Sequence, residues 1–314
     1  MRVHLANWFG VFAAVGLSLW VALGKAPDAD PAHLTKIRRV AATKWVRQGD
    51  EIGLRDATDH FVPRRSYQRI ISLSGVADSL LYHLVAPTRI SALSPYAERA
   101  AFAYRYQGFR QLNLKYDAEA LLALEPDLIL THHLSRMDRV MQLREAGLTV
   151  FDLGEMKGLD TLLPNIQTVA NLLNIPERGR AFAYRIETRM ARIADQQAPG
   201  PDAIYVGVHG DKMYGGTVGT SYHDVLMAAG LTDIAAGRYE GWTRYTQEHL
   251  LTLDPQVIVT QTGMARQLCD TSNLTQLRAC SATGQVVEVD TPLLLSPGPE
   301  MVEAAEEVHR KVFE

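Results

Sequence analysis

The sequence predicts an α/β chain of two similar lobes joined by one long helical connection. The chief observation is a segment that occurs twice, as EALLALEPDLILT at 119–131 and as EHLLTLDPQVIVT at 248–260. Each copy reads as a short helix that ends near a proline and is followed at once by an apolar run of strand length. Between the copies, the segment 158–198 carries helical spacing and little strand character. Two similar lobes imply a cleft between them, and a cleft implies a ligand.

The composition is that of a globular chain without an excess of positive charge. The 314 residues are 47% hydrophobic, which suffices for a large core and about two domains. The formal net charge of −3 provides no basic surplus for binding phosphates, so we expect no nucleic-acid partner. The sequence contains no nucleophile elbow, HExxH, P-loop or dinucleotide fingerprint. We therefore expect a binding protein with no intrinsic cofactor rather than an enzyme.

The first 26 residues read as an export signal. Arg2 precedes the uncharged apolar run 8–23, which is long for a cleaved signal and short for a membrane-spanning helix. Either a cleaved signal or an uncleaved membrane anchor fits this pattern, and both predict that the rest of the chain is exported to an oxidising compartment. In that oxidising compartment the two cysteines, Cys269 and Cys280, can close a small loop as a disulfide.

The N-terminal lobe is expected over 27–157. After a polar lead-in to about residue 50, apolar runs of strand length alternate with segments of helical spacing, separated by turn residues. The expected elements are a hairpin at 52–62, strands at 69–73, 89–93 and 149–153, helices at 76–84 and 138–146, and the first copy of the repeat, whose helix is capped by Asp117.

The connecting segment 158–198 shows helical spacing that Pro176 interrupts and that resumes at Arg178, and we expect a stiff helical connection that limits the motion of the lobes. The C-terminal lobe then occupies 199–314. Its glycine-rich segment 215–220 lacks the spacing and the lysine of a P-loop, so we interpret it as a loop. The other expected elements are strands at 203–208 and 285–289, helices at 222–229 and up to Phe313, and the second copy of the repeat, capped by Thr246.

Each copy of the repeat is preceded by a segment rich in aromatic and arginine residues. We call 100–116 the first aromatic segment and 234–245 the second. Ligands of parallel α/β sheets bind beyond the carboxyl ends of the strands, where such loops lie. Flat rings suit the face of a macrocycle, and arginine suits anionic groups. Position alone therefore makes ligand-binding candidates of Tyr104, Tyr106, Tyr214, Arg244 and Tyr245.

His132 and His133 follow the strand of the first repeat copy. Imidazole is the commonest metal ligand, so either ring is a candidate for holding a metal or haem. Because neighbouring residues of a strand point to opposite faces, at most one of the two can face a cleft, and we take His132 as the candidate.

The ordered set of segments resembles the periplasmic solute-binding proteins of ABC importers for vitamin B12, haem and iron-siderophores. The resemblance runs from about residue 50 to the C-terminus. Beside the two repeat copies, the matching segments are RIISLSGVADSLLYHL at 69–84, GGTVGTSYHDVLMAAG at 215–230 and LLSPGPEMVEAAEEV at 294–308. The resemblance implies two Rossmann-like lobes joined by a single long rigid helix, with the ligand cleft between them.

The resemblance also implies roles for individual residues. One exposed glutamate of each lobe is expected to meet arginines of the membrane permease, and the matching positions are Glu119 and Glu248. Trp242 matches the aromatic wall of the B12 carrier, and Tyr96 lies near the loop from which haem carriers supply an iron-binding tyrosinate. The implied partners are an ABC permease and a small metal chelate carried as ligand, and we expect the chain to act as a monomer.

The sequence leaves two other functions open. A receptor for a bare zinc or manganese ion would need three or four convergent ligands, for which His132 or His133, His209 and His223 are available. An uncleaved N-terminal anchor would instead suit a membrane-tethered sensor. Neither the metal ligands nor the identity of the chelate follows from the sequence.

Overall fold

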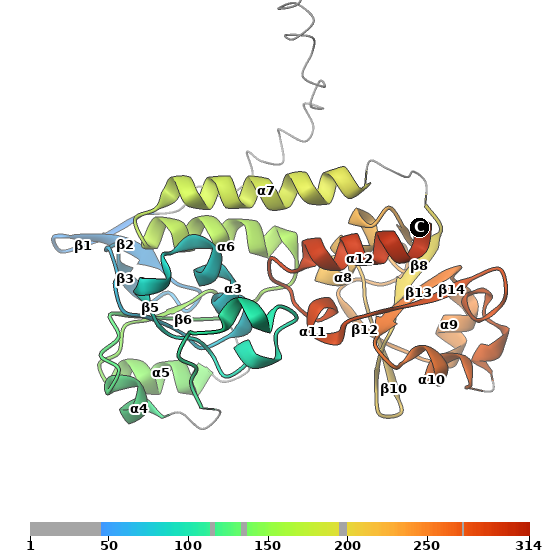
Figure 1. Ribbon diagram of the computed structural model, residues 1–314, viewed down its shortest axis with the longest axis horizontal. Helices are drawn as coiled ribbons and strands as arrows, with labels where there is room; N and C mark the ends of the chain where they lie inside the picture. The colour runs from blue at the N-terminus through green and yellow to red at the C-terminus, as the bar shows by residue number, and fades with distance from the viewer. Residues whose placement is uncertain (1–44, 114–116, 133–136, 195–199, 272) are drawn as a thin grey trace, which may run out of the picture. The chain divides into compact units, whose positions relative to one another are not determined.

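The computed structural model describes residues 45–113, 117–132, 137–194, 200–271 and 273–314 (Figure 1). The signal or anchor expected at 1–26 lies outside these residues. The described chain contains two four-stranded parallel sheets and two three-stranded antiparallel sheets. Helices accompany each parallel sheet, which is the α/β architecture expected from the sequence.

The sheet of the N-terminal half has the strand order β5-β4-β6-β7, with all neighbours parallel. Its central strands are entirely buried, as expected for a parallel sheet covered on both faces. The strands are β4 (Ile70–Ser72), β5 (Ile90–Ala92), β6 (Leu128–Thr131) and β7 (Val150–Asp152). The helices are α3 (Gly75–Leu84), α4 (Ala118–Leu122) and α5 (Met137–Glu145), with 3-10 turns η1 (Pro87–Arg89), η2 (Ala97–Arg99) and η3 (Ala103–Tyr106).

An antiparallel meander precedes this sheet. The hairpin expected at 52–62 is confirmed as β2 (Glu51–Arg55) and β3 (Phe61–Pro63), and the structure adds β1 (Val46–Gln48) at its edge. The three β1 residues are exposed or half-buried and only Val46 is apolar, so they carry no hydrophobic alternation from which a strand could be predicted. Asp56, at the end of β2, is buried and forms an ion pair with Arg144 of α5, which fastens the meander to the N-terminal sheet.

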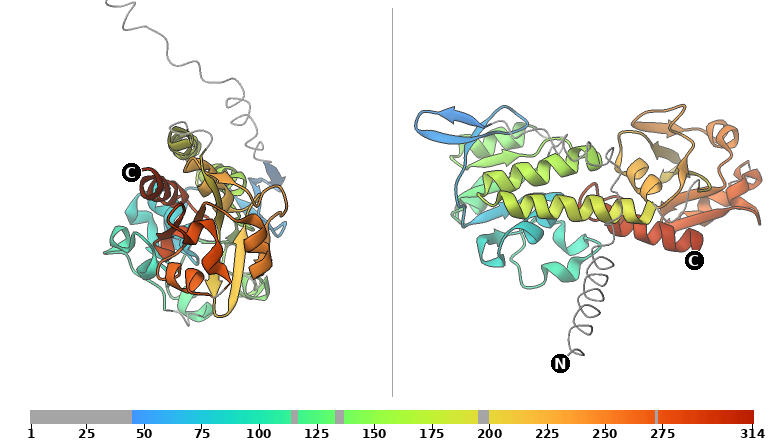
Figure 2. Two further views of the ribbon diagram at one scale, coloured as in Figure 1. Left: turned by 90° about the vertical axis from the view of Figure 1, so that its right-hand side faces the viewer. Right: turned by 90° about the horizontal axis from the view of Figure 1, so that it is seen from above.

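The connection between the halves is two helices, not the single helix expected over 158–198. Helices α6 (Leu159–Leu172) and α7 (Pro176–Ala194) pack side by side along their lengths (Figures 1 and 2). The chain reverses between them at Asn174, whose φ of 61° lies in the left-handed region that asparagine tolerates. Pro176 then begins α7, a position where its missing N–H costs no helical hydrogen bond.

The sheet of the C-terminal half has the order β11-β8-β13-β14, again all parallel. A second antiparallel sheet, β12-β10-β9, continues from it. The strands are β8 (Asp202–Tyr205), β9 (Gly207–His209), β10 (Lys212–Gly216), β11 (Thr232–Asp233), β12 (Trp242–Tyr245), β13 (Val257–Gln261) and β14 (Gln285–Val289). The helices are α8 (Ser221–Ala228), α9 (Gln247–Leu253), α10 (Ala265–Cys269), α11 (Thr291–Leu294) and α12 (Met301–Phe313), with turns η4 (Leu274–Gln276) and η5 (Arg278–Cys280).

The two copies of the repeat occupy equivalent places in the two parallel sheets. Their strands, β6 and β13, both stand third in the strand order, and their helices begin at the expected caps. Each copy also has an acidic residue with positive φ directly before its proline, Glu125 at 46° and Asp254 at 41°. Asp254 directly follows α9 and Glu125 lies three residues after α4, and in both copies this left-handed residue turns the chain toward the strand. The repeat is therefore a structural one as well as a sequence one.

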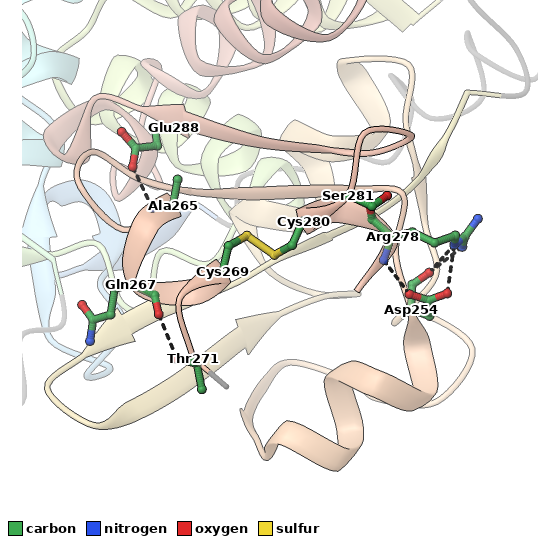
Figure 3. The surroundings of a disulfide bond; sticks show 9 residues. All are labelled: Asp254, Ala265, Gln267, Cys269, Thr271, Arg278, Cys280, Ser281 and Glu288. Carbon is green, nitrogen blue, oxygen red and sulfur yellow. Dashed lines mark hydrogen bonds and ion pairs between the residues drawn. A yellow bond between two sulfur atoms is a disulfide. The ribbon is translucent and has the colours of Figure 1, made fainter. Parts of the chain in front are cut away.

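The two cysteines form a disulfide at the edge of the C-terminal half (Figure 3). Cys269 ends α10 and Cys280 ends η5, with their Cα atoms 5.5 Å apart. Beside the bridge, the Arg278 side chain pairs with the Asp254 carboxylate at 3.1 Å and so ties the loop to the end of α9. Among the helices of the described ranges, none combines the length and the apolar character needed to cross a membrane.

Candidate functional site

The antiparallel sheet β12-β10-β9 presents a face that carries three of the predicted ligand residues. In its register Tyr214 lies opposite Arg244, and Gly216 lies opposite Trp242. Opposite residues of an antiparallel pair share a face, as do alternate residues along one strand. Tyr214, Trp242 and Arg244 therefore lie on one face, with Arg244 exposed and Tyr214 half-buried. The face combines aromatic surface with a cationic donor.

Trp242 is the exposed aromatic side chain of this face, with 60% of its surface exposed. Its ring meets the edge of Tyr222 at a centroid distance of 5.0 Å, and Tyr222 in turn stacks on Tyr205 at 3.6 Å. Tyr222 also fills the space beside Gly216, where a Cβ would come within 2.5 Å of the ring. Burial raises the pKa of the Tyr222 hydroxyl, which keeps it neutral. Trp242 thus packs against a buried aromatic stack while most of its own surface stays exposed.

Tyr245, predicted to bind ligand, lies on the opposite face of β12 and belongs to the core. It is 3% exposed and meets the edge of Tyr239 at 5.7 Å. Its ring covers Gly215, where a Cβ would lie 2.2 Å from the ring atoms. Strand alternation is the physical reason: Trp242 and Arg244 point one way and Tyr245 the other.

The candidate tyrosines in and just before the first aromatic segment are divided between surface and core in a similar manner. Tyr96, before η2, is 45% exposed, and Tyr104, in η3, is 64% exposed. Tyr106 is instead a core residue, 2% exposed, packed edge-to-face on Tyr82 at 5.8 Å. Burial raises the pKa of its hydroxyl. Tyr116, the last residue of this segment, lies outside the described residues.

The histidines do not assemble into a metal centre in the part of the chain that the structure describes. There, no group of three or more His, Cys, Asp or Glu side chains is placed to hold a metal ion. His132 is half-buried at the end of β6, His209 is exposed on β9, and His133 falls outside the described residues. His223 binds the buried Asp233 through Nδ1 at 2.7 Å, and this hydrogen bond raises the pKa of the imidazole.

Glu119 and Glu248, the predicted docking residues, occupy the same place in the first turns of α4 and α9. Both side chains are exposed. A hydrogen bond from Thr246 lowers the pKa of the Glu248 carboxyl, which favours its charged form. Three residues further along each helix an exposed leucine, Leu122 or Leu251, shares the glutamate's side of the helix.

Tyr205 and Tyr222 support the site, and the sequence reading did not single them out. Each lies within an element that was predicted, a strand and a helix, but their stacking joins residues from different elements. The available signal was the pair of glycines at 215–216 beside an aromatic helix start, because a glycine on a sheet face leaves room for a neighbouring ring.

Comparison with known proteins relates the chain to binding proteins. The model of the "Periplasmic binding protein" family matches residues 70–292. A "Cobalamin-binding protein" of Halobacterium salinarum is 29% identical over 60% of this chain and 53% of the relative, so the chain matches about half of that protein's length. A "Vitamin B12-binding protein" of Yersinia pestis is 26% identical over 63% of this chain and 71% of the relative.

Among solved structures, a "Periplasmic Heme Binding Protein from Pseudomonas aeruginosa" is similar in fold, with a TM-score of 0.64. It is 23% identical, and the match covers 78% of this chain and 92% of that one. The family model spans all four strands of the N-terminal sheet and all four of the C-terminal sheet. The chain therefore belongs to the periplasmic binding protein family.

Proposed function

We propose that the chain is the solute-binding protein of an ABC importer, which captures a metal chelate and delivers it to a membrane permease. The chelate class is a corrinoid, a haem or a ferric siderophore, the first two being the ligands named for the relatives in sequence and in fold. The observation that carries the proposal is the exposed face formed by Tyr214, Trp242 and Arg244.

The chemistry of this face suits a flat anionic chelate. Trp242 offers the face of an indole, which gains from stacking on a macrocycle and loses little conformational entropy on binding. Arg244 stands beside it with a planar guanidinium that can bind a carboxylate through two donors. Tyr96 and Tyr104, both exposed in the N-terminal half, would supply further aromatic contact or a tyrosinate ligand.

The test is a binding titration of the purified chain with cyanocobalamin, haemin and a ferric siderophore, followed by substitution. Trp242→Ala should lower the affinity for the chelate by roughly tenfold or more, since an aromatic contact buried on binding is worth about 1–3 kcal/mol. Trp45→Ala is the matched control, because Trp45 is also exposed, at 43%, and lies before β1. Equal chelate affinity of Trp242→Ala and Trp45→Ala would show that Trp242 does not contact the ligand.

Delivery to the permease is proposed to use Glu119 and Glu248. The argument is their identical, exposed placement in two equivalent helices, because the helix dipole alone would accept either acidic residue anywhere in the first turn. Glu119→Gln and Glu248→Gln should leave chelate affinity unchanged and lower uptake by cells that carry the permease. Unchanged uptake by the double variant would contradict this docking role.

The proposed location is the periplasm, reached through the N-terminal export signal or anchor. Family membership and the disulfide agree with an oxidising compartment. A receptor for a bare zinc or manganese ion gains no support from the described residues, since no group of three or more His, Cys, Asp or Glu side chains among them is placed to hold a metal ion.

A further inference from the structure

Arg105 belongs to the first aromatic segment and contacts both Phe102 of that segment and Glu303 of α12. Its guanidinium carbon sits 3.8 Å from the centre of the Phe102 ring. Its Nη2 atom is 3.8 Å from Oε1 of Glu303 in the first turn of α12. Only 17% of the Arg105 side chain and 23% of the Glu303 side chain are exposed. The pair is therefore partly shielded from solvent and joins residues of the N-terminal and the C-terminal halves.

Glu303 is itself held in place by a second cation. Arg189 of α7 reaches Oε1 of Glu303 at 3.3 Å and Oε2 of Glu306 at 2.8 Å. Because α7 and α12 pack together, Glu303 belongs to a fixed helical layer rather than to a free surface. The carboxylate thus offers the aromatic segment an anchor whose position is set by two helices.

The contacts of Arg105 matter because they fix the segment that carries the exposed Tyr104 side chain. Tyr104 precedes Arg105, is 64% exposed, and meets Phe102 edge-on at a centroid distance of 6.0 Å. Tyr106 follows Arg105 and is buried in the N-terminal half. Tyr104 is therefore presented by a short helix that is fixed on one side by Tyr106 and on the other by Arg105.

We infer that Arg105 is a positioning residue for the ligand site: through Phe102 and Glu303 it holds Tyr104 in place against the α7–α12 layer. This inference rests on the proposed function. A side chain fixed before the ligand arrives spares the entropy of ordering it, so loss of the anchor should weaken binding without removing any contact to the ligand. The arrangement also ties the position of a ligand residue to the contact between the two halves.

The test compares Arg105→Gln, Arg105→Lys, Glu303→Gln and the double variant Arg105→Gln/Glu303→Gln. The matched control is Glu306→Gln, which removes the same charge from α12 and contacts Arg189 but not the aromatic segment. Affinity is measured for cyanocobalamin and haemin, and hydrogen exchange for the amides of residues 103–109, which η3 and its flanking turns protect.

We expect Arg105→Gln and Glu303→Gln each to weaken binding by roughly three- to tenfold, in line with a partly shielded ion pair. The double variant should be no weaker than either single one, because both remove the same interaction. Arg105→Lys should fall between wild type and Arg105→Gln, since it keeps the charge and loses the planar stack on Phe102. Exchange at 103–109 should accelerate in all of these except Glu306→Gln.

Unchanged affinity in Arg105→Gln would overturn the positioning role, whether or not exchange accelerates. Unchanged hydrogen exchange at residues 103–109 in Arg105→Gln and Glu303→Gln would show that Arg105 does not anchor this segment. If the wild-type chain binds neither cyanocobalamin nor haemin, the exchange measurement still decides whether Arg105 anchors the segment, and the failure then belongs to the proposed function.

Discussion

Acidification should destabilise the fold through His83, which lies in α3 against α7. The imidazole stacks on Phe182 at a centroid distance of 4.6 Å. Burial, with smaller contributions from Arg105, Arg185 and Arg189, lowers its pKa from 6.5 to about 4. The unfolded chain therefore takes up a proton near pH 6.5, and the folded chain only near pH 4. Stability is lost as the pH falls through this window.

The size of the effect follows from the gap between the two pKa values. At pH 5 the histidine of the unfolded chain is about 1.5 pH units below its pKa, so protonation stabilises the unfolded state by roughly 2 kcal/mol at about 1.4 kcal/mol per unit. Partial exposure of the ring reduces this to about 1–2 kcal/mol. His83→Phe keeps the stack on Phe182 and removes the titration, so its stability relative to wild type should rise by that amount between pH 7 and pH 5.

Urea unfolding of both proteins at several pH values measures this difference. The comparison must be between proteins at one pH, because Asp78 works in the opposite direction. Burial raises the pKa of the Asp78 carboxyl to about 6, so the folded state holds that proton more tightly and gains stability as the pH falls. A difference between wild type and His83→Phe that stays constant from pH 7 to pH 5 would refute the role of His83.

Three further changes should lower stability by separate mechanisms. Gly216→Ala places a Cβ within 2.5 Å of the Tyr222 ring and should cost about 1–3 kcal/mol in urea unfolding, together with a shifted tryptophan emission. Ser79→Ala removes the 2.6 Å hydrogen bond to the buried Glu300 carboxyl and should cost about 1–3 kcal/mol, whereas a loss below the error of measurement would show that another donor replaces it. Cys269→Ser opens the disulfide loop and should lower the free energy of unfolding by roughly 3 kcal/mol, an effect that a reductant should reproduce in the wild-type chain.

Much of the fold could be predicted from short-range sequence signals in the repeat. Asp117 and Thr246 cap their helices as expected, with the Asp117 carboxylate accepting a hydrogen bond from the Ala120 amide at 2.8 Å. A cap, a proline and an apolar run are all signals within a few residues, so they need no knowledge of the rest of the chain. The single helix expected over 158–198 was wrong because its outcome is not a local one. Pro176 was visible in the sequence, but the reversal at Asn174 that makes two packed helices depends on tertiary contacts.

The sequence predicted which residue types the candidate site would contain, but not the directions in which their side chains point. The glycines of the second aromatic segment suggested a loop, whereas 242–245 is a strand whose alternation separates Trp242 and Arg244 from Tyr245. Recognising that strand would have placed Trp242 and Arg244 on one face and Tyr245 on the other. No such rule exists for Tyr106, which is buried by residues distant in sequence, or for the pair of Arg105 with Glu303.

The central claim, a metal chelate bound on the face of Trp242, is tested most directly by calorimetric titration at several temperatures. We expect cyanocobalamin, haemin or a ferric siderophore to bind saturably with a negative heat-capacity change, the mark of apolar surface buried on binding. Trp242→Ala should reduce that change, and Trp45→Ala should not. Failure of all three chelates to bind, with stoichiometric zinc in the purified protein, would contradict the account.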